Sequence, residues 1–410
     1  MNNSHSAVPP PTVLQTTLFK ITETLAQELA RPTSRAPDWS ELEWKIAPAV
    51  AAMHGVSPLL SSTLPWQGPA AWRQFLEQQR AHTAQRHARI VELLRRIDVR
   101  ARADGIAAVA LKGAALHAMG LYESGERPMA DIDLLVRPAD AERTAGMLES
   151  LGFYESCASW KERVFTPVDE HVPGRLGEHA DNNIKIELHE RICEKLPWQI
   201  TDITSLVFPN QATRGLNDYP SRASLMIHLL LHAAGAMAFQ ALRLLHLHDL
   251  ALLSSQMSQA DWDEVLAYRS RGRELWWALP PLELMRRYYG AEVPARVRVA
   301  LEIDCPFLLE KISKHKSLYE VSYSYLWVDA FPGIEWSHSV REILRYTISR
   351  VRPTAEHLAH REQSAKIQAW ASEGQWARMS QGRRIARWLI SRPTRPVTMH
   401  AVHAALAQPQ

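Results

Sequence analysis

The sequence predicts an α+β fold in which a small α/β unit lies between helical sections. Long segments with apolar residues at helical spacing occupy both ends of the chain, and short apolar segments bounded by glycine or charged residues are concentrated between them. Strands that alternate with helices are typical of an α/β unit. We therefore expect an N-terminal helical section (1–104), a core (105–200) and a C-terminal helical domain (201–410).

The first hundred residues are expected to be helical after a proline-rich start. The expected helices cover residues 12–30, 41–53 and 69–102. In the last of these, Trp72, Phe75 and Leu76 follow helical spacing among many Arg, Gln and Glu residues, which indicates an amphipathic helix. The turn-rich segment HGVSPLLSSTLPW separates the second helix from the third.

The pattern changes at Gly105. We expect strands at IAAVALKG, ADIDLLV, 162–168 and 183–190, and helices at AALHAMGLY and 138–151. Gly152 supplies a C-terminal stop for the second of these helices. A polar loop, HVPGRLGEHADN, is expected between the last two strands. These segments form the small α/β unit.

The sequence becomes helical again from about residue 201. The expected helices cover residues 220–240, 242–256, 259–269, 274–289, 340–349 and 381–390. Aromatic residues are dense between Tyr319 and Trp336, where we expect a loop or edge structure that packs on the helices.

Composition places the chain among ordinary globular proteins. Its 410 residues are 46% apolar and 22% charged, and its net charge is +3. The absence of a strong basic excess makes a long nucleic acid a less favoured partner. Three scattered cysteines and the lack of a signal-like N-terminus favour a cytoplasmic location. The most apolar region, 225–253, contains charged and histidine residues, which argues against a membrane span.

Two acids in the strand ADIDLLV predict a metal site. Asp131 and Asp133 point to the same face of a strand, where like charges repel each other unless a cation lies between them. Mg²⁺ prefers such carboxylate ligands, and a two-metal site takes a third acid from a neighbouring strand. Glu187 in IKIELHE is the candidate for that acid. The alternative, a D-x-D in a surface turn, fits the apolar LLV that follows less well.

These residues carry a family resemblance. The run LKGAALHAMGLYESGERPMADIDLLVRPADAERTAGMLESLGF, followed by IELHE, resembles the uncharacterised nucleotidyltransferase family of the polymerase-beta-like superfamily. That superfamily has a glycine motif after its first strand, a D-x-D on the second and a third acid on a later strand. The resemblance is densest between Gly105 and Arg191, and it continues more weakly into RRIDVRARADGI, LLLHAAG and LRLLHLHDLALL.

The resemblance implies a nucleotidyl transfer reaction. Asp131 and Asp133 would bind two Mg²⁺ or Mn²⁺ ions that carry a nucleoside triphosphate, and Glu187 would complete the site. An acceptor hydroxyl on a small molecule, peptide or protein would attack the α-phosphate and release pyrophosphate. The chain departs from the superfamily pattern by having Lys112-Gly113 in place of Gly-Ser, a longer gap to Asp131, and a glutamate as the third acid.

The basic residues near the acids each have two interpretations. Lys112 is either a phosphate ligand, with Gly113 allowing close approach of the backbone, or a strand-end lysine in solvent. Arg127 either clamps a phosphate or pairs with Glu123 or Glu126.

Histidines near the acids are also ambiguous. His189 shares the strand face of Glu187, so it could orient that acid, touch the substrate or be a partly buried histidine. Zinc bound by His189 and Cys193 is rejected because four ligands at suitable spacing are missing. His228 and His232 are four apart on one helix, either as core histidines at a helix contact or as a metal pair.

Two further segments are charged. Arg243 and Asp249 either form a structural ion pair or allow Arg243 to reach the nucleotide. The basic stretch WARMSQGRRIARWLISRPTRP is either the solvated face of a terminal helix or a surface for an acidic partner or a membrane.

Three functions are thus open. The first is a Mg²⁺-dependent nucleotidyltransferase, the second a non-catalytic nucleotide-binding or interaction protein, and the third an enzyme that modifies RNA. The sequence indicates neither the acceptor nor the nucleotide base.

Overall fold

A mixed six-stranded sheet forms the centre of the α/β unit. The computed structural model describes residues 8–407 except 170–175, 271–272, 355–357 and 359–378. The strands are, in sheet order, β3 (Phe153–Ala158), β4 (Arg163–Pro167), β5 (Lys185–His189), β2 (Asp131–Val136), β1 (Ala107–Ala110) and β8 (Gly215–Asn217). Strand β2 is parallel to β5 and antiparallel to β1. Its register pairs Asp131 with Lys185 and Asp133 with Glu187.

The side chains on the two faces of β2 pack in different parts of the molecule. Ile132 and Leu134 pack in a cluster with residues of α4 (Ala70–Asp104) and α6 (Ala141–Ser150). Leu135, on the opposite face, belongs to a second cluster formed mainly by helices. Asp131 and Asp133 lie on the same face as Leu135, since residues two apart in a strand point the same way. The acids therefore face the helical part of the molecule.

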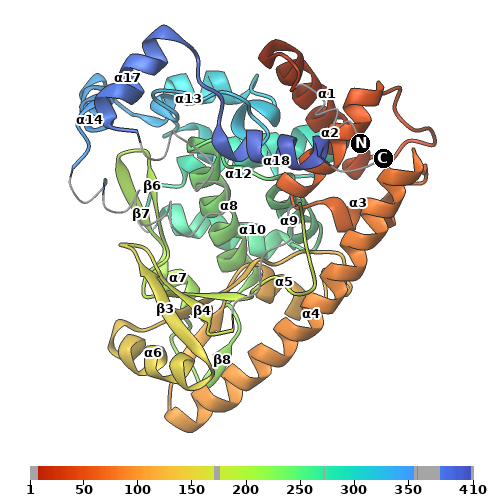
Figure 1. Ribbon diagram of the computed structural model, residues 1–410. Coiled ribbons are helices and arrows are strands. Elements are labelled where there is room, and N and C mark those ends of the chain that lie inside the picture. The colour runs from red at the N-terminus through yellow and green to blue at the C-terminus, as the bar shows by residue number, and fades with distance from the viewer. Residues whose placement is uncertain (1–7, 170–175, 271–272, 355–357, 359–378, 408–410) are drawn as a thin grey trace.

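The N-terminal helices lead to the sheet along α4. They are α1 (Pro11–Ala30), α2 (Glu41–Met53), α3 (Ser57–Thr63) and α4. Figure 1 shows α4 as the long helix that runs down one side of the molecule to the level of α6 and β8. It ends at Gly105, whose φ of 70° is the left-handed conformation that suits glycine at a helix C-terminus. The chain then turns directly into β1.

The C-terminal half is mostly helical. A two-stranded hairpin precedes it, formed by β6 (Cys193–Leu196) and β7 (Gln199–Asp202). The helices are α7 (Thr204–Val207), α8 (Arg222–Ala238), α9 (Leu244–Ser255), α10 (Gln259–Ser270), α11 (Leu279–Tyr289), α12 (Ala295–Glu302), α13 (Phe307–Ser313), α14 (Val340–Val351), α17 (Gln381–Ile390) and α18 (Pro396–Leu406). Short 3-10 turns are η1 (Pro138–Asp140), η2 (Trp276–Ala278), η3 (Tyr319–Val321) and η4 (Ile334–Trp336).

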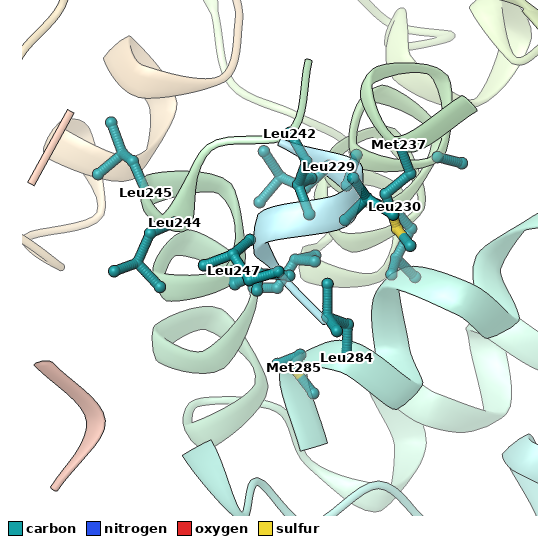
Figure 2. Packing of buried hydrophobic residues seen from close by; sticks show 14 of the residues in the cluster. Leu229, Leu230, Met237, Leu242, Leu244, Leu245, Leu247, Leu284 and Met285 are labelled. Carbon is teal, nitrogen blue, oxygen red and sulfur yellow. The ribbon is translucent and has the colours of Figure 1, made fainter. Parts of the chain in front are cut away.

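The central helix of this half is α8. Nearly all of its residues are buried, and Figure 2 shows Leu229, Leu230 and Met237 packed with leucines of α9 and with Leu284 and Met285 of α11. The same cluster contains Leu18 of α1, so the N-terminal and C-terminal helices share one apolar core. A helix with apolar residues on all its faces has to be covered on every side, and here other helices cover α8.

Most expected elements are present, with several differences. The helices expected at 41–53 and 381–390 have those bounds, and the expected strands correspond to β1, β2, β4 and β5. The helix expected at 274–289 is divided into η2 and α11, where Pro280 and Pro281 mark the start of a new helix. The turn-rich segment after α2 contains α3. Not expected were β3, β6, β7 and β8 and the helices α3, α7, α12, α13 and α18.

Three further predictions concern a membrane span, the basic stretch near the C-terminus and the aromatic segment 319–336. Within the described ranges, no helix combines the length and the apolar character needed to cross a bilayer. The basic stretch that ends at Pro396 lies partly in α17, where Leu389 and Ile390 are exposed, while Trp376 lies outside the described residues. The expected loop of aromatic residues at 319–336 contains η3 and η4, and Trp336 is buried.

Candidate active site

The acids of β2 and β5 meet on one face of the sheet. Asp133 is 6% exposed, and Glu187 lies directly opposite it in the parallel register. His189, two residues further along β5, donates from Nε2 to Asp133 Oδ1 at 3.0 Å, because an ionised carboxylate only accepts. The same nitrogen lies 3.8 Å from Glu187 Oε2. Two neighbouring strands thus bring three side chains to one point.

These three side chains form the possible metal group among the described residues. One ligand atom each from Asp133, Glu187 and His189 lies within 4.8 Å of the others. The sequence predicted Asp131, Asp133 and Glu187 as ligands, so His189 takes the place of Asp131 in this group. Asp131 lines the same cavity, one step along the same strand face. Oxygen and imidazole ligands together suit Mn²⁺ as well as Mg²⁺.

Lys112 makes the closest contact to these acids. Its Nζ lies 2.7 Å from Asp133 Oδ1, and the lysine side chain is only 17% exposed. The interpretation of Lys112 as a strand-end lysine in solvent is therefore wrong. The cation found beside the aspartates in this structure is the ammonium of Lys112.

The backbone of Lys112 is held in an uncommon conformation. Its φ is 46° and its ψ −112°, a region that residues with a Cβ rarely adopt and that costs about 1–3 kcal/mol. The Leu111 N–H donates to the Asp133 carbonyl at 3.0 Å, and the Lys112 N–H donates to Tyr219 Oη at 3.2 Å. Tyr219 in turn donates to His228 Nδ1 at 2.7 Å. These bonds on both sides of the turn oppose its relaxation.

The charges of the site are strongly coupled. Burial alone would raise the pKa of Asp133, but the Lys112 ammonium and the His189 hydrogen bond hold that pKa well below its ordinary value. Burial and the charge of Asp133 raise the pKa of Asp131. Burial and the two aspartates raise the pKa of Glu187 well above its ordinary value. The charge of Lys112 favours ionisation of all three acids, but the pKa values of Asp131 and Glu187 stay raised, and a further cation would lower them.

Arg127 forms a buried ion pair with Asp249 of α9. Its Nε and Nη2 donate to the two carboxylate oxygens of Asp249 at 2.9 and 2.8 Å, and Tyr122 Oη donates to the same carboxylate at 2.6 Å. The alternative in which Arg127 pairs with Glu123 or Glu126 is therefore wrong, and so is the alternative in which Arg243 pairs with Asp249. The buried Arg127–Asp249 pair joins the loop before β2 to α9.

Gly113 is needed by this pair. A Cβ on Gly113 would lie 2.2 Å from Arg127 Nη1 and 2.8 Å from Met129 Sδ. The group that lies close to Gly113 in this structure is thus the guanidinium of Arg127. The roles of Gly113 and Arg127 towards a nucleotide stay predictions.

Arg243 forms no ion pair with a carboxylate in the part of the chain that the structure describes. It stands at the start of α9, half-buried, with its guanidinium 5.1 Å from the centre of the Tyr323 ring. Its charge lowers the pKa of Asp131, which places it on the side of that acid. Among the described residues that line the cavity, Lys112, Arg127 and Lys161 form ion pairs with carboxylates, whereas Arg243 forms none.

A cavity of about 400 Å³ joins these groups. Its walls are the acid-bearing ends of β2 and β5, the turn at Lys112, and residues of α8 and α9. On the side of β5, Lys161 Nζ lies 2.6 Å from Glu194 Oε1, and His232 Nδ1 lies 3.8 Å from the same atom. Burial opposes ionisation of Glu194, but contacts with His232 and Lys161 hold its pKa at about 2.

The histidine pair of α8 has two different roles. His228 accepts from Tyr219, as above, while His232 faces Glu194 in the cavity wall. Their ring nitrogens have separate partners, and no described metal group contains them. His228 fits the interpretation as a core histidine at a contact between a helix and another segment. Burial lowers the pKa of His228 well below its ordinary value.

Four residues of the site could not be identified from the sequence. Tyr219 and Glu194 lie outside the recognisable motifs, and Lys161 and Glu162 lie in a turn before β4. Glu162 adds a fourth negative charge that raises the pKa of Glu187, and its Oε2 lies 4.0 Å from the otherwise unpartnered Nδ1 of His189. No spacing signal marks these residues, because only the folded sheet brings them together.

The fold and the acids define a class of protein. An α+β fold with paired acids on one strand of a mixed sheet, a third acid on the neighbouring strand and helices across the cavity is consistent with the nucleotidyltransferase class that the sequence resembles.

The chain belongs to the uncharacterised nucleotidyltransferase family, whose model matches residues 40–289. That range is more than half of the chain and runs from the N-terminal helices through the sheet to α11. Neither a curated protein nor a solved structure shows a significant match. Membership supports nucleotidyl transfer as the class of chemistry.

Proposed function

We propose that the protein is a metal-dependent nucleotidyltransferase that moves a nucleoside monophosphate from a triphosphate to a hydroxyl of a small molecule, peptide or protein. The observation that carries the proposal is the convergence of Asp133, Glu187 and His189 within 4.8 Å at the wall of a cavity that also contains Asp131. Buried acids that crowd together in this way are costly for a fold unless they serve a cation.

The donor set fits a divalent cation. Carboxylate oxygens from two neighbouring strands and one imidazole nitrogen offer hard ligands for Mg²⁺ or Mn²⁺. The raised pKa values of Asp131 and Glu187 mark negative charge that Lys112 alone does not neutralise. When bound, such ions would neutralise phosphate charge and polarise the phosphorus–oxygen bonds.

The remaining roles belong to side chains of the chain itself. Arg243, which has no carboxylate partner among the described residues, would bind a phosphate from the side of Asp131. Glu187, which belongs to β5, would help to draw the proton from the acceptor hydroxyl. The helices α8 and α9 close the cavity and would limit the entry of water.

The direct test is transfer of labelled nucleotide. The full chain is incubated with each of the α-labelled nucleoside triphosphates and Mg²⁺ or Mn²⁺, and label is sought on small molecules, peptides and protein. We expect transfer with wild type and a loss of at least about a hundredfold in Asp133→Asn and in Glu187→Gln. Glu310→Gln is the matched control, since Glu310 pairs with Lys314 on the surface of α13.

Other results would point elsewhere. Metal-dependent triphosphate binding without transfer to any acceptor would favour a non-catalytic nucleotide-binding protein. Label on RNA, with binding that weakens steeply as salt rises, would favour an RNA-modifying enzyme. Equal transfer by wild type and both site variants would contradict the proposal.

A further inference from the structure

The ammonium of Lys112 bonds to the carboxylate of Asp133, which a metal ion at this site would need as a ligand. Lys112 Nζ and His189 Nε2 both bond to Asp133 Oδ1, at 2.7 and 3.0 Å. Asp133 is 7% exposed as a side chain, so water contributes little at this oxygen. A divalent cation that takes Oδ1 of Asp133 as a ligand has to displace the like-charged ammonium, and one that takes Oδ2 is repelled by it across the same carboxylate. Lys112 and a metal ion therefore compete for Asp133.

The backbone directs Lys112 to this place. The turn conformation, with φ at 46°, is one that glycine adopts far more readily than lysine. Leu111 bonds to the Asp133 backbone, and Lys112 bonds through Tyr219 to His228 of α8. The turn is thus fixed both to β2 and to the helical domain, and its side chain starts beside Asp133.

The cavity offers the displaced ammonium another partner. Lys112 lines it together with Arg243, and a lysine side chain can swing about its four-carbon stem. The phosphates of a triphosphate placed in this cavity would accept a charge-assisted hydrogen bond from Nζ. Free metal displaces the ammonium without offering it an anion, whereas metal with triphosphate supplies one.

We propose that Lys112 makes metal binding at Asp133 conditional on triphosphate, so that the site takes up the metal–triphosphate complex and discriminates against free metal. This inference rests on the proposed function for the identity of the ligand. Metal and triphosphate bind with positive coupling, and by linkage each tightens the other by the same factor. Lys112 is the source of that coupling because it changes partner from Asp133 to phosphate.

The test measures the binding of metal and nucleotide separately and together. Calorimetry on the full chain uses Mn²⁺ alone, a non-reacting triphosphate with a methylene bridge between its α- and β-phosphorus atoms, and both. In Lys112→Met we expect Mn²⁺ alone to bind about tenfold tighter, and the triphosphate with Mn²⁺ about tenfold weaker, than in wild type. With the affinity for triphosphate alone unchanged, the coupling factor then falls about a hundredfold.

Two further variants control the result. Lys314→Met removes an ammonium that pairs with Glu310 at the end of α13, away from the cavity, so it reports the general effect of one lost charge. We expect it to change either affinity by no more than about threefold. Lys112→Gly removes the ammonium and relieves the backbone, and it should repeat the binding pattern if Lys112→Met folds poorly.

The outcomes separate the two proposals. Unchanged affinity for Mn²⁺ alone in both Lys112 variants would overturn the competition, whatever the nucleotide does. Tighter Mn²⁺ binding with no triphosphate binding in any form, wild type included, would support the competition and overturn both the conditional uptake and the transferase function. Equal effects of Lys314→Met and Lys112→Met would also overturn the inference, because the effect would then be one of overall charge.

Discussion

At the scale of single residues, the acids could be predicted and their partners could not. The two-residue period of a strand is enough to place Asp131 beside Asp133, and a parallel neighbour places Glu187 opposite. The ion pairs depend on distant segments: Asp249 lies 122 residues after Arg127, and Tyr219 lies 107 residues after Lys112. No local pattern encodes such pairs, which is why the ion pairs considered for Arg127 and Arg243 from the sequence are not the ones that form.

The two aspartates should differ in their effect on stability. Asp133→Asn leaves the buried Lys112 without its carboxylate, so we expect a loss of about 3–5 kcal/mol in the free energy of unfolding. Asp131→Asn removes a charge that repels Asp133 and should cost no more than about 0.5 kcal/mol. Urea unfolding in the presence of a chelator measures both. Equal losses would show that Lys112 has no special dependence on Asp133.

Gly113 gives a second test at this scale. Gly113→Ala places a methyl group 2.2 Å from Arg127 Nη1, and we expect a loss of about 1–3 kcal/mol as the Arg127–Asp249 pair shifts. The matched control is Gly146→Ala in α6, where nothing lies within 4 Å of the new Cβ. That change should stabilise the protein by about 0.5–1 kcal/mol. A loss in the control, or none at Gly113, would contradict the packing described.

At the scale of elements, length and periodicity decided what could be predicted. Long amphipathic helices such as α1 and α4 and apolar strands such as β2 were expected close to their observed bounds. Strand β8 has three residues, and the four-residue β6 has two adjacent charged residues, Glu194 and Lys195, at its centre, so neither has an apolar signal. These strands form because the sheet edge and α8 offer partners that the local sequence does not reveal.

The start of α2 allows a test by pH. Ser40 and Glu43 form a reciprocal cap, and Lys20 bonds to the same carboxylate at 2.9 Å. Burial alone would raise the pKa of Glu43, but these bonds lower it below its ordinary value of 4.5. A lowered carboxyl pKa stabilises the fold above the unfolded pKa, and the benefit is lost as pH falls through the folded one.

The corresponding variant is Glu43→Gln. It should be less stable than wild type at neutral pH by about 0.5–2 kcal/mol, the range for loss of a helix cap. The difference should shrink as urea unfolding is repeated at successively lower pH below 4.5, because the wild-type carboxyl gains its proton as pH falls through its lowered pKa. A difference that is independent of pH would mean that the carboxylate charge does not stabilise α2.

At the scale of the whole molecule, the acids lie between two apolar clusters. One joins the sheet to α4 and α6, and the other joins the N-terminal helices to the C-terminal ones. Strand β2 contributes to both, through Leu134 on one face and Leu135 on the other. Cavity walls from both clusters therefore meet at Asp131 and Asp133, and the position of the helices relative to the sheet decides the shape of the site.

The shared helical cluster predicts that stability is transmitted between the ends of the chain. Leu18 of α1 is fully buried in that cluster, which also contains Leu284 and Met285 of α11. Leu18→Ala should cost about 2–5 kcal/mol and lower the hydrogen-exchange protection of α11 by a similar amount, although the two helices are far apart in sequence. Leu148→Ala in α6 is the matched control, since Leu148 is equally buried in the other cluster. It should lower protection in α6 and β2 and leave α11 within about 0.5 kcal/mol. If Leu18→Ala lowers protection in α1 alone, the helices at the two ends do not unfold together, and the cavity wall formed by α8 and α9 depends on the C-terminal helices without support from α1.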